Sequence, residues 1–246
     1  MTERVLYAEL TPRDFLERVR RAPIAYLPLG TLEWHGAHLP LGADGLQSEG
    51  FFVELAREVG GVVLPKLFVG PDRHQEADGV DYYGMDTSDH GQEPPQQLAG
   101  SAYWVPDELF EQILRAILKQ LRRAGFRVVV GHGHGPSTGC LRDHAEQWGR
   151  EFGLRLFHCW GPDDSDGLGI QTDHAAANET SLVMALHPDL VQMENLPEDP
   201  DVWPTAVGGK DPRQFASAER GRRAIEKQVE RMAGILREAL AELPAE

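Results

Sequence analysis

Residues 24–44 read IAYLPLGTLEWHGAHLPLGAD, an apolar run followed at once by a segment rich in acids and imidazoles. A short, continuous apolar run that ends at a glycine is typical of a strand buried on both faces of a parallel sheet. Glu33 and His35 lie two residues apart, so in an extended segment both side chains point to the same side. His38 and Asp44 follow closely. The end of this strand therefore carries an unusual number of side chains that can bind a metal ion.

Strand and helix patterns alternate along the rest of the chain, which predicts a single layered α/β domain over residues 1–246. The first apolar strand is followed by a helical pattern and then by a second apolar run, an order that requires parallel pairing. Strands are expected over 24–29, 62–69, 126–130 and 154–158, and helices over 12–20 (capped by Thr11), 46–59, 106–123, 141–152, 178–186 and 216–243.

Two segments carry more specific expectations. Residues 71–97 are rich in Asp, Gln, Gly and Pro and poor in aliphatic residues, which predicts a long loop or lid insertion. In the segment 106–123, an apolar residue recurs every four positions, which predicts a strong helix. These apolar residues are Leu109, Ile113, Ile117 and Leu121.

The bulk composition excludes several classes of function. The formal net charge is −15, and so acidic a surface repels phosphate groups, which argues against nucleic acid or an anionic membrane as a partner. No apolar run approaches the roughly 20 residues that span a bilayer, and the first residues contain no apolar segment of signal-peptide length. We therefore expect a cytoplasmic protein.

A second group of imidazoles follows the third predicted strand, in GHGHGPSTG at residues 131–139. His132 and His134 are again two apart, and the glycines around them let the backbone approach a bound ion closely. Imidazoles mixed with carboxylates suit zinc, manganese or iron rather than calcium, which prefers oxygen ligands. The two strand ends offer more ligands than one ion requires, which indicates two divalent ions that share a bridging carboxylate.

The same stretch contains a competing signal. Residues 135–139 match G-x-S-x-G, the nucleophile elbow of serine hydrolases, with Ser137 as the nucleophile. In that motif the serine follows the strand directly, whereas here the apolar run ends at Val130. The motif also leaves Glu33, His35 and Asp44 without a role.

A third group lies in DHAAANETS, residues 173–181. Glu179 is a candidate ligand and His174 a candidate proton-transfer group. Residues five apart lie roughly 140° apart around a helix, so both face one pocket only if His174 precedes the helix. In the alternative interpretation, this segment is an ordinary helix start with Asp173 or Asn178 as the cap.

These segments together resemble the creatininase (creatinine amidohydrolase) family. Residues 29–44 are similar to its signature G-S-x-E-Q-H-G-P-H-L-P-L-x-x-D. Residues 125–135 resemble the G-F-R run that enters N-G-H-G-G-N, and residues 173–181 resemble H-A-G-x-x-E-T-S. Residues 209–221 are similar to a later G-D-P and A-x-x-E-x-G stretch. The four segments occur in the family's order and cover most of the chain.

The resemblance implies a three-layer α/β/α fold around a mainly parallel sheet, a homo-oligomer that is often a hexamer, and a two-metal centre that hydrolyses amide bonds. Creatininases carry a glutamate at the position of Pro136, whereas broader members of the family use the E-T-S glutamate instead. By this correspondence Glu33 and His134 bind one ion, His35 and Glu179 bind the other, and Asp44 bridges them.

The resulting hypothesis is a metal-dependent hydrolase of a C–N amide bond in a small cyclic or linear amide. Two divalent ions (Zn, Mn or Fe) activate a bridging hydroxide, and His174 donates a proton to the departing nitrogen. The expected substrate contacts are His38, Ser101 and Tyr83. Two alternatives are a serine hydrolase that uses Ser137 and a non-catalytic metal- or ligand-binding protein on the same scaffold.

Overall fold

The computed structural model of the chain describes residues 4–87, 95–161 and 167–244. Its main sheet contains four parallel strands in the order β2-β1-β5-β6. They are β1 (Ile24–Leu29), β2 (Val62–Val63), β5 (Val128–Gly133) and β6 (Arg155–Phe157). β1 pairs with β5 along its whole length, from Ile24 opposite Val128 to Leu29 opposite Gly133. The two central strands therefore end side by side at one edge of the sheet.

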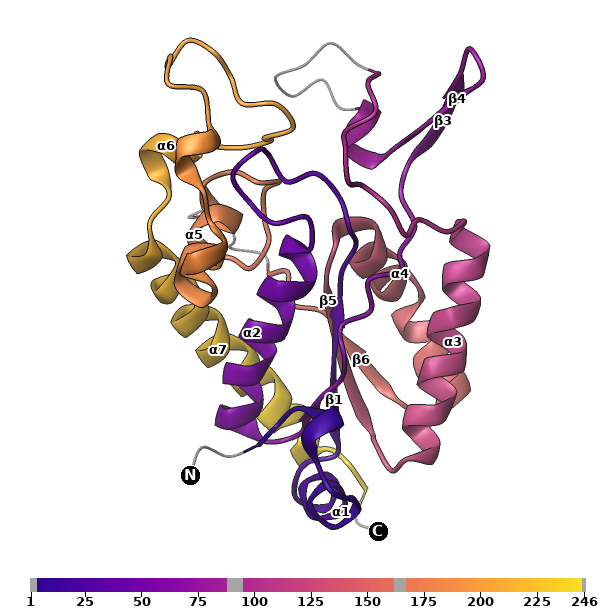
Figure 1. The fold of residues 1–246 in the computed structure, drawn as a ribbon. Coiled ribbons are helices and arrows are strands. Elements are labelled where there is room, and N and C mark those ends of the chain that lie inside the picture. Colours follow the sequence, from indigo (N-terminus) through magenta and orange to yellow (C-terminus); the bar gives the residue numbers. More distant parts are fainter. Residues whose placement is uncertain (1–3, 88–94, 162–166, 245–246) are drawn as a thin grey trace.

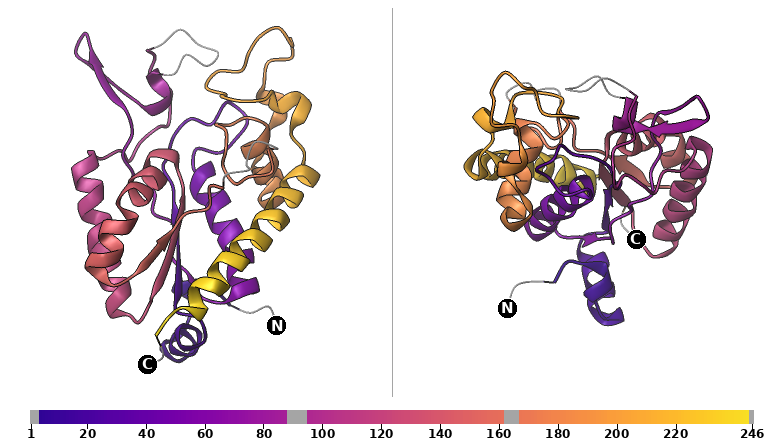
Figure 2. Two further views of the ribbon diagram at one scale, coloured as in Figure 1. Left: turned by 180° about the vertical axis from the view of Figure 1, so that it is seen from behind. Right: turned by 45° about the horizontal axis from the view of Figure 1, so that its top comes forward.

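Helices cover both faces of this sheet (Figures 1 and 2), so the predicted three-layer α/β/α fold is confirmed. One layer contains α2 (Ala43–Val59), α5 (Ala177–Leu186) and α7 (Ala218–Ala241), and the other contains α3 (Asp107–Arg123) and α4 (Gly135–Phe152). Among the described residues, no helix combines the length and low polarity needed to cross a bilayer. The shorter helices are α1 (Pro12–Arg21), α6 (Pro212–Phe215), η1 (Tyr7–Glu9), η2 (Gly84–Thr87), η4 (Pro188–Leu190) and η5 (Met193–Asn195).

The core divides according to the alternation of side chains along β1. Ile24 and Tyr26 pack among apolar residues of α2 and α7, whereas Ala25 and Leu27 pack among those of α3 and α4. Successive side chains of a strand point to opposite faces, so a strand covered on both sides has to be apolar throughout. All six residues of β1 are buried, which explains its unbroken apolar run.

The order of the strands creates a switch point between β1 and β5. The chain leaves β1 through α2 to reach β2 on one side, and it later returns to β5 on the other side. The segments that follow β1 and β5 therefore diverge from a common edge, which is where open parallel sheets bind ligands. Figure 1 shows these segments gathered at the upper end of the molecule, opposite α1.

Several element boundaries differ from the prediction. β2 covers two residues instead of eight, because beyond Val63 the chain touches β1 only through single contacts such as the Leu29–Leu67 bridge. α4 begins at Gly135 rather than at residue 141, with Pro136 in its first turn, where proline's fixed φ and missing N–H fit best. α2 begins at Ala43, so Asp44 lies in a helical first turn.

Part of the predicted loop at 71–97 is a β-hairpin. Strands β3 (His74–Ala77) and β4 (Val80–Tyr83) pair antiparallel and rise from the carboxyl edge of the main sheet (Figure 1). Asp78 and Gly79 join them with φ values of 52° and 76°, the left-handed pair that a tight hairpin turn of type I′ requires. The Asp78-Gly79 pair was thus a local signal for the hairpin, although the polar composition of residues 71–97 favoured a loop. Residues 88–94 of this segment lie outside the described residues.

The buried face of α3 is rotated from the apolar spacing that indicated this helix in the sequence. Leu109 is 44% exposed, whereas Phe110, Leu114 and Leu118 are fully buried, and only Leu121 belongs to both sets. A strict spacing of four drifts by about 40° at each step around a helix of 3.6 residues per turn. The buried residues Phe110, Leu114, Leu118 and Leu121 follow steps of four, four and three, so they stay on one side of the helix. A series with only steps of four drifts away from that side.

This correction gives a matched pair of variants. We expect Leu114→Ala to lower the free energy of unfolding by about 2–5 kcal/mol, because it leaves a cavity in a fully buried site. We expect Leu109→Ala to change it by less than about 0.5 kcal/mol, because the side chain is exposed. Urea unfolding followed by circular dichroism measures both, and equal losses would contradict the assigned face.

Candidate metal centre

Five of the predicted side chains converge at the carboxyl edge of the sheet from four separate segments. They line or border a hollow of about 380 Å³ between the loops that follow β1 and β5. The segment after β1 supplies Glu33 and His35, the first turn of α2 supplies Asp44, His134 forms the N-cap of α4, and the first turn of α5 supplies Glu179.

One group of potential ligand atoms surrounds His35. Its Nε2 lies 3.4 Å from Asp44 Oδ1 and 3.7 Å from Glu179 Oε2. Two ligand atoms on one tetrahedral ion with bonds of about 2.0–2.1 Å lie about 3.3 Å apart. The spacing around His35 is close to that value, so His35, Asp44 and Glu179 could hold one cation.

A second group consists of Glu33, Asp44 and His134, whose ligand atoms all lie within 4.8 Å of one another. His134 Nε2 is 3.9 Å from Glu33 Oε1. Asp44 belongs to both groups, and a carboxylate has two oxygens with which to serve two cations. The geometry thus brings together two candidate cation sites around one shared carboxylate.

The hydrogen bonds within the site leave several potential metal-binding atoms without a partner. His35 Nδ1 donates to the carbonyl of Glu33 at 3.1 Å, which fixes the tautomer and leaves Nε2 to face the carboxylates. His35 Nε2, Glu33 Oε2 and Asp44 Oδ2 are buried and have no hydrogen-bond partner. Orphaned polar atoms in a buried site are costly, and a cation satisfies all three at once. The residues present therefore fit a two-ion centre.

The electrostatics of the group indicate a shortage of positive charge. Burial raises the pKa of Glu33 and that of Glu179, because both carboxyls lie out of water and beside Asp44. Burial alone would lower the pKa of His35, but Asp44, Glu179 and Glu33 outweigh it and raise that pKa to about 10. Protons on Glu33, Glu179 and His35 thus reduce the negative charge in the absence of ions, while Asp44 stays ionised beside His35, and metal ions would displace those protons.

His174 lies beside this group, on the loop before α5 as the hypothesis required. Its Nε2 donates to the carbonyl of Trp34 at 2.9 Å, and its Nδ1 lies 3.8 Å from Glu33 Oε1. Its ring lies against that of His35, with centroids 4.4 Å apart and the ring planes tilted by 30°. Burial, together with the positive charge on His35, lowers the pKa of His174 to about 3. Its Nδ1 therefore presents a free lone pair to the hollow.

Ser137 does not occupy a nucleophile elbow. It lies in the first turn of α4, it is fully buried, and its Oγ is 3.0 Å from His134 Nδ1. His134 Nε2 in turn lies 3.3 Å from Asp72 Oδ2, so the connection superficially resembles a catalytic triad. A nucleophile has to reach its substrate, and Ser137 has no exposed surface. Its hydroxyl instead fixes the orientation of the His134 ring.

Two other polar residues near the site have structural partners. His132 donates from Nε2 to the carbonyl of Ile170 at 3.1 Å and accepts from the amide of Cys159. Burial lowers the pKa of His132 to about 4, so it is neutral at pH 7. Asp173 accepts the amides of Asn178 at 2.7 Å and Glu179 at 3.1 Å, so it satisfies first-turn amides of α5 although the N-cap residue is Ala176.

The three predicted substrate contacts lie outside the lining of the hollow. His38 is buried and donates from Nε2 to Thr180 Oγ1 at 2.8 Å, which ties the loop after β1 to α5. Ser101 Oγ accepts the amide of Trp34 at 3.1 Å. Tyr83 is half-buried on the hairpin and stacks on Trp104 with centroids 5.5 Å apart. In this structure each of them supports the walls of the site.

Two residues of the site were not predicted from the sequence. Gln171 donates from Nε2 to Asp44 Oδ1 at 3.1 Å and has a φ of 53°, a conformation that is rare for a side chain of its type. Asp72 reaches into the hollow from the segment after β2. The rule that points to strand ends, applied to the second strand as well, would have identified Asp72; no sequence signal marks Gln171.

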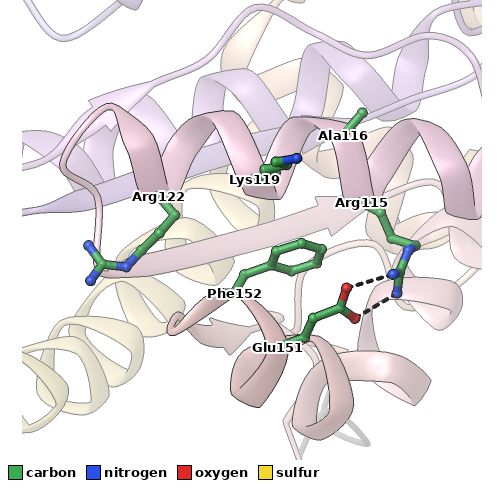
Figure 3. Close-up of a pocket in the computed structure, with 6 residues that line it drawn as sticks. All are labelled: Arg115, Ala116, Lys119, Arg122, Glu151 and Phe152. Carbon is green, nitrogen blue, oxygen red and sulfur yellow. Dashed lines mark hydrogen bonds and ion pairs between the residues drawn. The ribbon is translucent and has the colours of Figure 1, made fainter.

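A larger hollow of about 530 Å³ lies elsewhere, between α3 and α4 (Figure 3). A two-bond ion pair between Arg115 and Glu151 closes one end of it, beside the ring of Phe152. Its lining residues contain a single carboxylate, which is already paired, and no imidazole or thiol. It offers neither a ligand set nor a nucleophile, so the chemistry points to the smaller hollow.

Comparison with known proteins agrees with the resemblance seen in the sequence. The family model for creatininase (creatinine amidohydrolase) matches residues 8–236. The creatinine amidohydrolase of Pseudomonas putida is 26% identical over 273 residues, which cover 97% of this chain and 98% of that protein. A crystal structure of creatinine amidohydrolase is similar with a TM-score of 0.74 and 23% identity, covering 97% of this chain and 98% of that chain. A mutant creatininase of the Zn-Zn type is similar with a TM-score of 0.73 and 23% identity, covering 97% and 99%.

The neutral state of His132 predicts a pH dependence of stability. Its pKa is about 4 in the folded protein and about 6.5 when unfolded, so between these values the unfolded state binds more protons. Its contribution is therefore present above pH 6.5 and is lost as the pH falls toward 4, a loss on the order of 3 kcal/mol. Urea unfolding of the metal-free protein should show a shallower decline for His132→Gln than for the wild type. Parallel curves would contradict the assignment.

Proposed function

The chain belongs to the creatininase family, and from that premise we propose that it hydrolyses the C–N bond of a small linear or cyclic amide at a two-metal centre. One observation carries the proposal. Residues far apart in the sequence place two ligand groups around Asp44 and leave three buried polar atoms without a hydrogen-bond partner. Carboxylates mixed with imidazoles in such groups suit zinc or manganese.

The proposed ligands divide by geometry. Glu33 and His134 would hold one ion, His35 and Glu179 would hold the other, and Asp44 would contribute to both. Ions held in this way supply a water of lowered pKa and polarise an amide carbonyl. Everything else in the reaction has to come from side chains of this chain.

His174 is the proposed proton carrier. Its Nε2–H is committed to Trp34, so only Nδ1 can exchange a proton with a molecule in the hollow. Because its pKa is about 3, His174 begins neutral and has to accept a proton before it can donate one. We propose that Nδ1 takes the proton from the attacking water and delivers it to the departing nitrogen. The carbonyl carbon gains the oxygen, the C–N bond breaks, and the amine leaves neutral.

The contact between the rings of His35 and His174 supports this order of events. In the metal-free protein the charge of His35 is one cause of the low pKa of His174. A ligand imidazole on a cation stays neutral, but the cation itself then provides positive charge nearby. In the metal-free protein a proton on Nδ1 of His174 is unstable, which favours its transfer to a leaving nitrogen.

The metal assignment predicts an ordered set of losses. Elemental analysis of the metal-saturated protein should give two equivalents per chain. His134→Asn and Glu179→Gln should each lose about one equivalent, whereas Asp44→Asn should lose both, because only Asp44 belongs to both groups. Removal of the ions by a chelator should abolish hydrolysis across a panel of small amides, and adding zinc or manganese back should restore it.

The matched control is Glu54→Gln, since Glu54 pairs with Arg57 on the surface of α2 and should leave both ions in place. One equivalent in the wild type, or equal losses in all three ligand variants, would rule out the shared carboxylate. A serine hydrolase using Ser137 predicts activity that a chelator does not affect. A non-catalytic metal-binding protein predicts two ions but no turnover of any amide.

The role of His174 gives a separate prediction. His174→Asn should lower kcat by roughly 10²–10⁴-fold, the usual contribution of a positioned acid–base group, while the metal content stays at two equivalents. His144→Gln is the matched control, because His144 stacks on Trp148 within α4 and should leave kcat unchanged. A His174 variant that keeps full activity would exclude it as the proton carrier.

A further inference from the structure

Asp72 is an acidic side chain of the hollow that the proposed mechanism does not use. It is only 8% exposed, and it faces the site from the segment between β2 and the hairpin. Its Oδ1 accepts the backbone amide of Arg73 at 2.7 Å, and its Oδ2 lies 3.3 Å from His134 Nε2. The group is therefore held in place through one oxygen and directed at the site with the other.

The partner of Oδ2 is the atom that His134 would offer to an ion. An imidazole nitrogen that binds a cation carries no proton, so with His134 as a ligand, Oδ2 no longer receives a hydrogen bond from it. Asp72 belongs to neither of the two ligand groups described above. It is also absent from a third set of ligand atoms within 4.8 Å of one another, Glu33, His35 and His174, so the geometry does not make it a ligand itself. In the working enzyme Oδ2 needs another partner.

The charges of the site identify the kind of partner. The carboxylates of Glu33, Asp44 and Glu179, together with one hydroxide, would balance the charge of two divalent ions. A second carboxylate that lines the hollow, Asp173, already accepts amides at the start of α5. The negative charge of Asp72 is therefore left over beside the ions, and a poorly solvated carboxylate is stabilised most by a cationic hydrogen-bond donor.

The structure leaves room for such a donor. The hollow is lined by Asp72, Glu33 and Gly84, so a ligand inside it can reach Asp72 Oδ2. A side chain at Gly84, where φ is 52°, would begin only 2.6 Å from Asp72 Oδ2 and obstruct that approach, which glycine avoids. Arg73 also lines the hollow and its positive charge acts on Asp72, but the hydrogen bond to Asp72 comes from its backbone amide and its side chain is exposed.

We propose that Asp72 Oδ2 binds a positively charged hydrogen-bond donor of the substrate, a protonated amine or an amidinium, and so selects cationic amides over neutral ones of the same shape. This inference rests on the proposed function, since it names the substrate class of that same site. Asp72 acts here as a specificity residue that contacts the substrate away from the scissile bond.

The test compares two amides of equal size, 3-aminopropanamide, which is cationic at pH 7, and butanamide, which is neutral. The metal-loaded wild type should prefer the cation by on the order of tenfold or more, the usual scale for a hydrogen bond between charged groups. Asp72→Asn should reduce that preference to about twofold or less and keep both ions. The ratio is taken from kcat/KM if the amides are hydrolysed and from calorimetric Kd values if they are not.

Asp81→Asn is the matched control, because Asp81 is an exposed acid on the neighbouring β3–β4 hairpin, paired with His74. It removes the same charge from the surface and should keep the wild-type preference. The inference is overturned if the wild type shows no preference, if Asp72→Asn keeps it, if Asp81→Asn loses it as well, or if Asp72→Asn loses an ion. Failure of the proposed function is a different result, namely the absence of metal-dependent hydrolysis, and the binding comparison still reports on Asp72 in that case.

Discussion

The site depends on one electrostatic constraint: several carboxylates share a volume from which water is largely excluded. Glu33, Asp44 and Glu179 are each about 3% exposed, and nearby imidazoles provide the only positive charge within their groups. Like charges at such separations cannot all remain ionised without cations. The shift of the Glu33 and Glu179 pKa values upward, and of the His35 pKa to about 10, expresses that constraint in the metal-free protein. Two divalent ions would relieve this repulsion between the carboxylates, so metal binding and the stability of this end of the fold depend on the same charges.

The fold meets the constraint through the pairing of β1 with β5. Because Leu29 and Gly133 are opposite each other, the segments that carry Glu33 and His134 start from the same edge. The amide of His134 donates to the carbonyl of Leu29 at 3.0 Å, which locks the two loops together. A side chain at Gly133 would begin 1.6 Å from that carbonyl, so only glycine permits this contact. The rigid sheet thereby brings together Glu33 and His134, the two residues proposed to hold one ion, while α2 and α5 add Asp44 and Glu179 from the side.

The sequence predicted the parts of this arrangement that local pattern controls. The run 24–29 gave the exact bounds of β1, and the acids and imidazoles after β1 and β5 identified the residues that converge. Tertiary packing decided what the sequence could not show. Leu109 lies outside the buried face of α3 because that face depends on which side meets the sheet, and Leu109 and Phe110 are equally apolar. Gln171 reaches Asp44 only because residues 127 apart in the chain meet in the fold.

The line Ser137–His134–Asp72 shows why connectivity alone does not define a mechanism. A serine hydroxyl, an imidazole and a carboxylate lie in hydrogen-bonding sequence, with separations of 3.0 and 3.3 Å. In a serine hydrolase the serine is exposed and the acid is buried behind the ring. Here the order of exposure is reversed: Ser137 is buried in α4 and the carboxylate of Asp72 faces the hollow. The Ser137 hydroxyl therefore holds the His134 ring through Nδ1, and Nε2 points into the hollow. A metal ligand needs this orientation, whereas a general base for Ser137 would not. Because Ser137 is buried and Asp72 faces the hollow, the arrangement of Ser137, His134 and Asp72 suits metal binding by His134 rather than nucleophilic attack by Ser137.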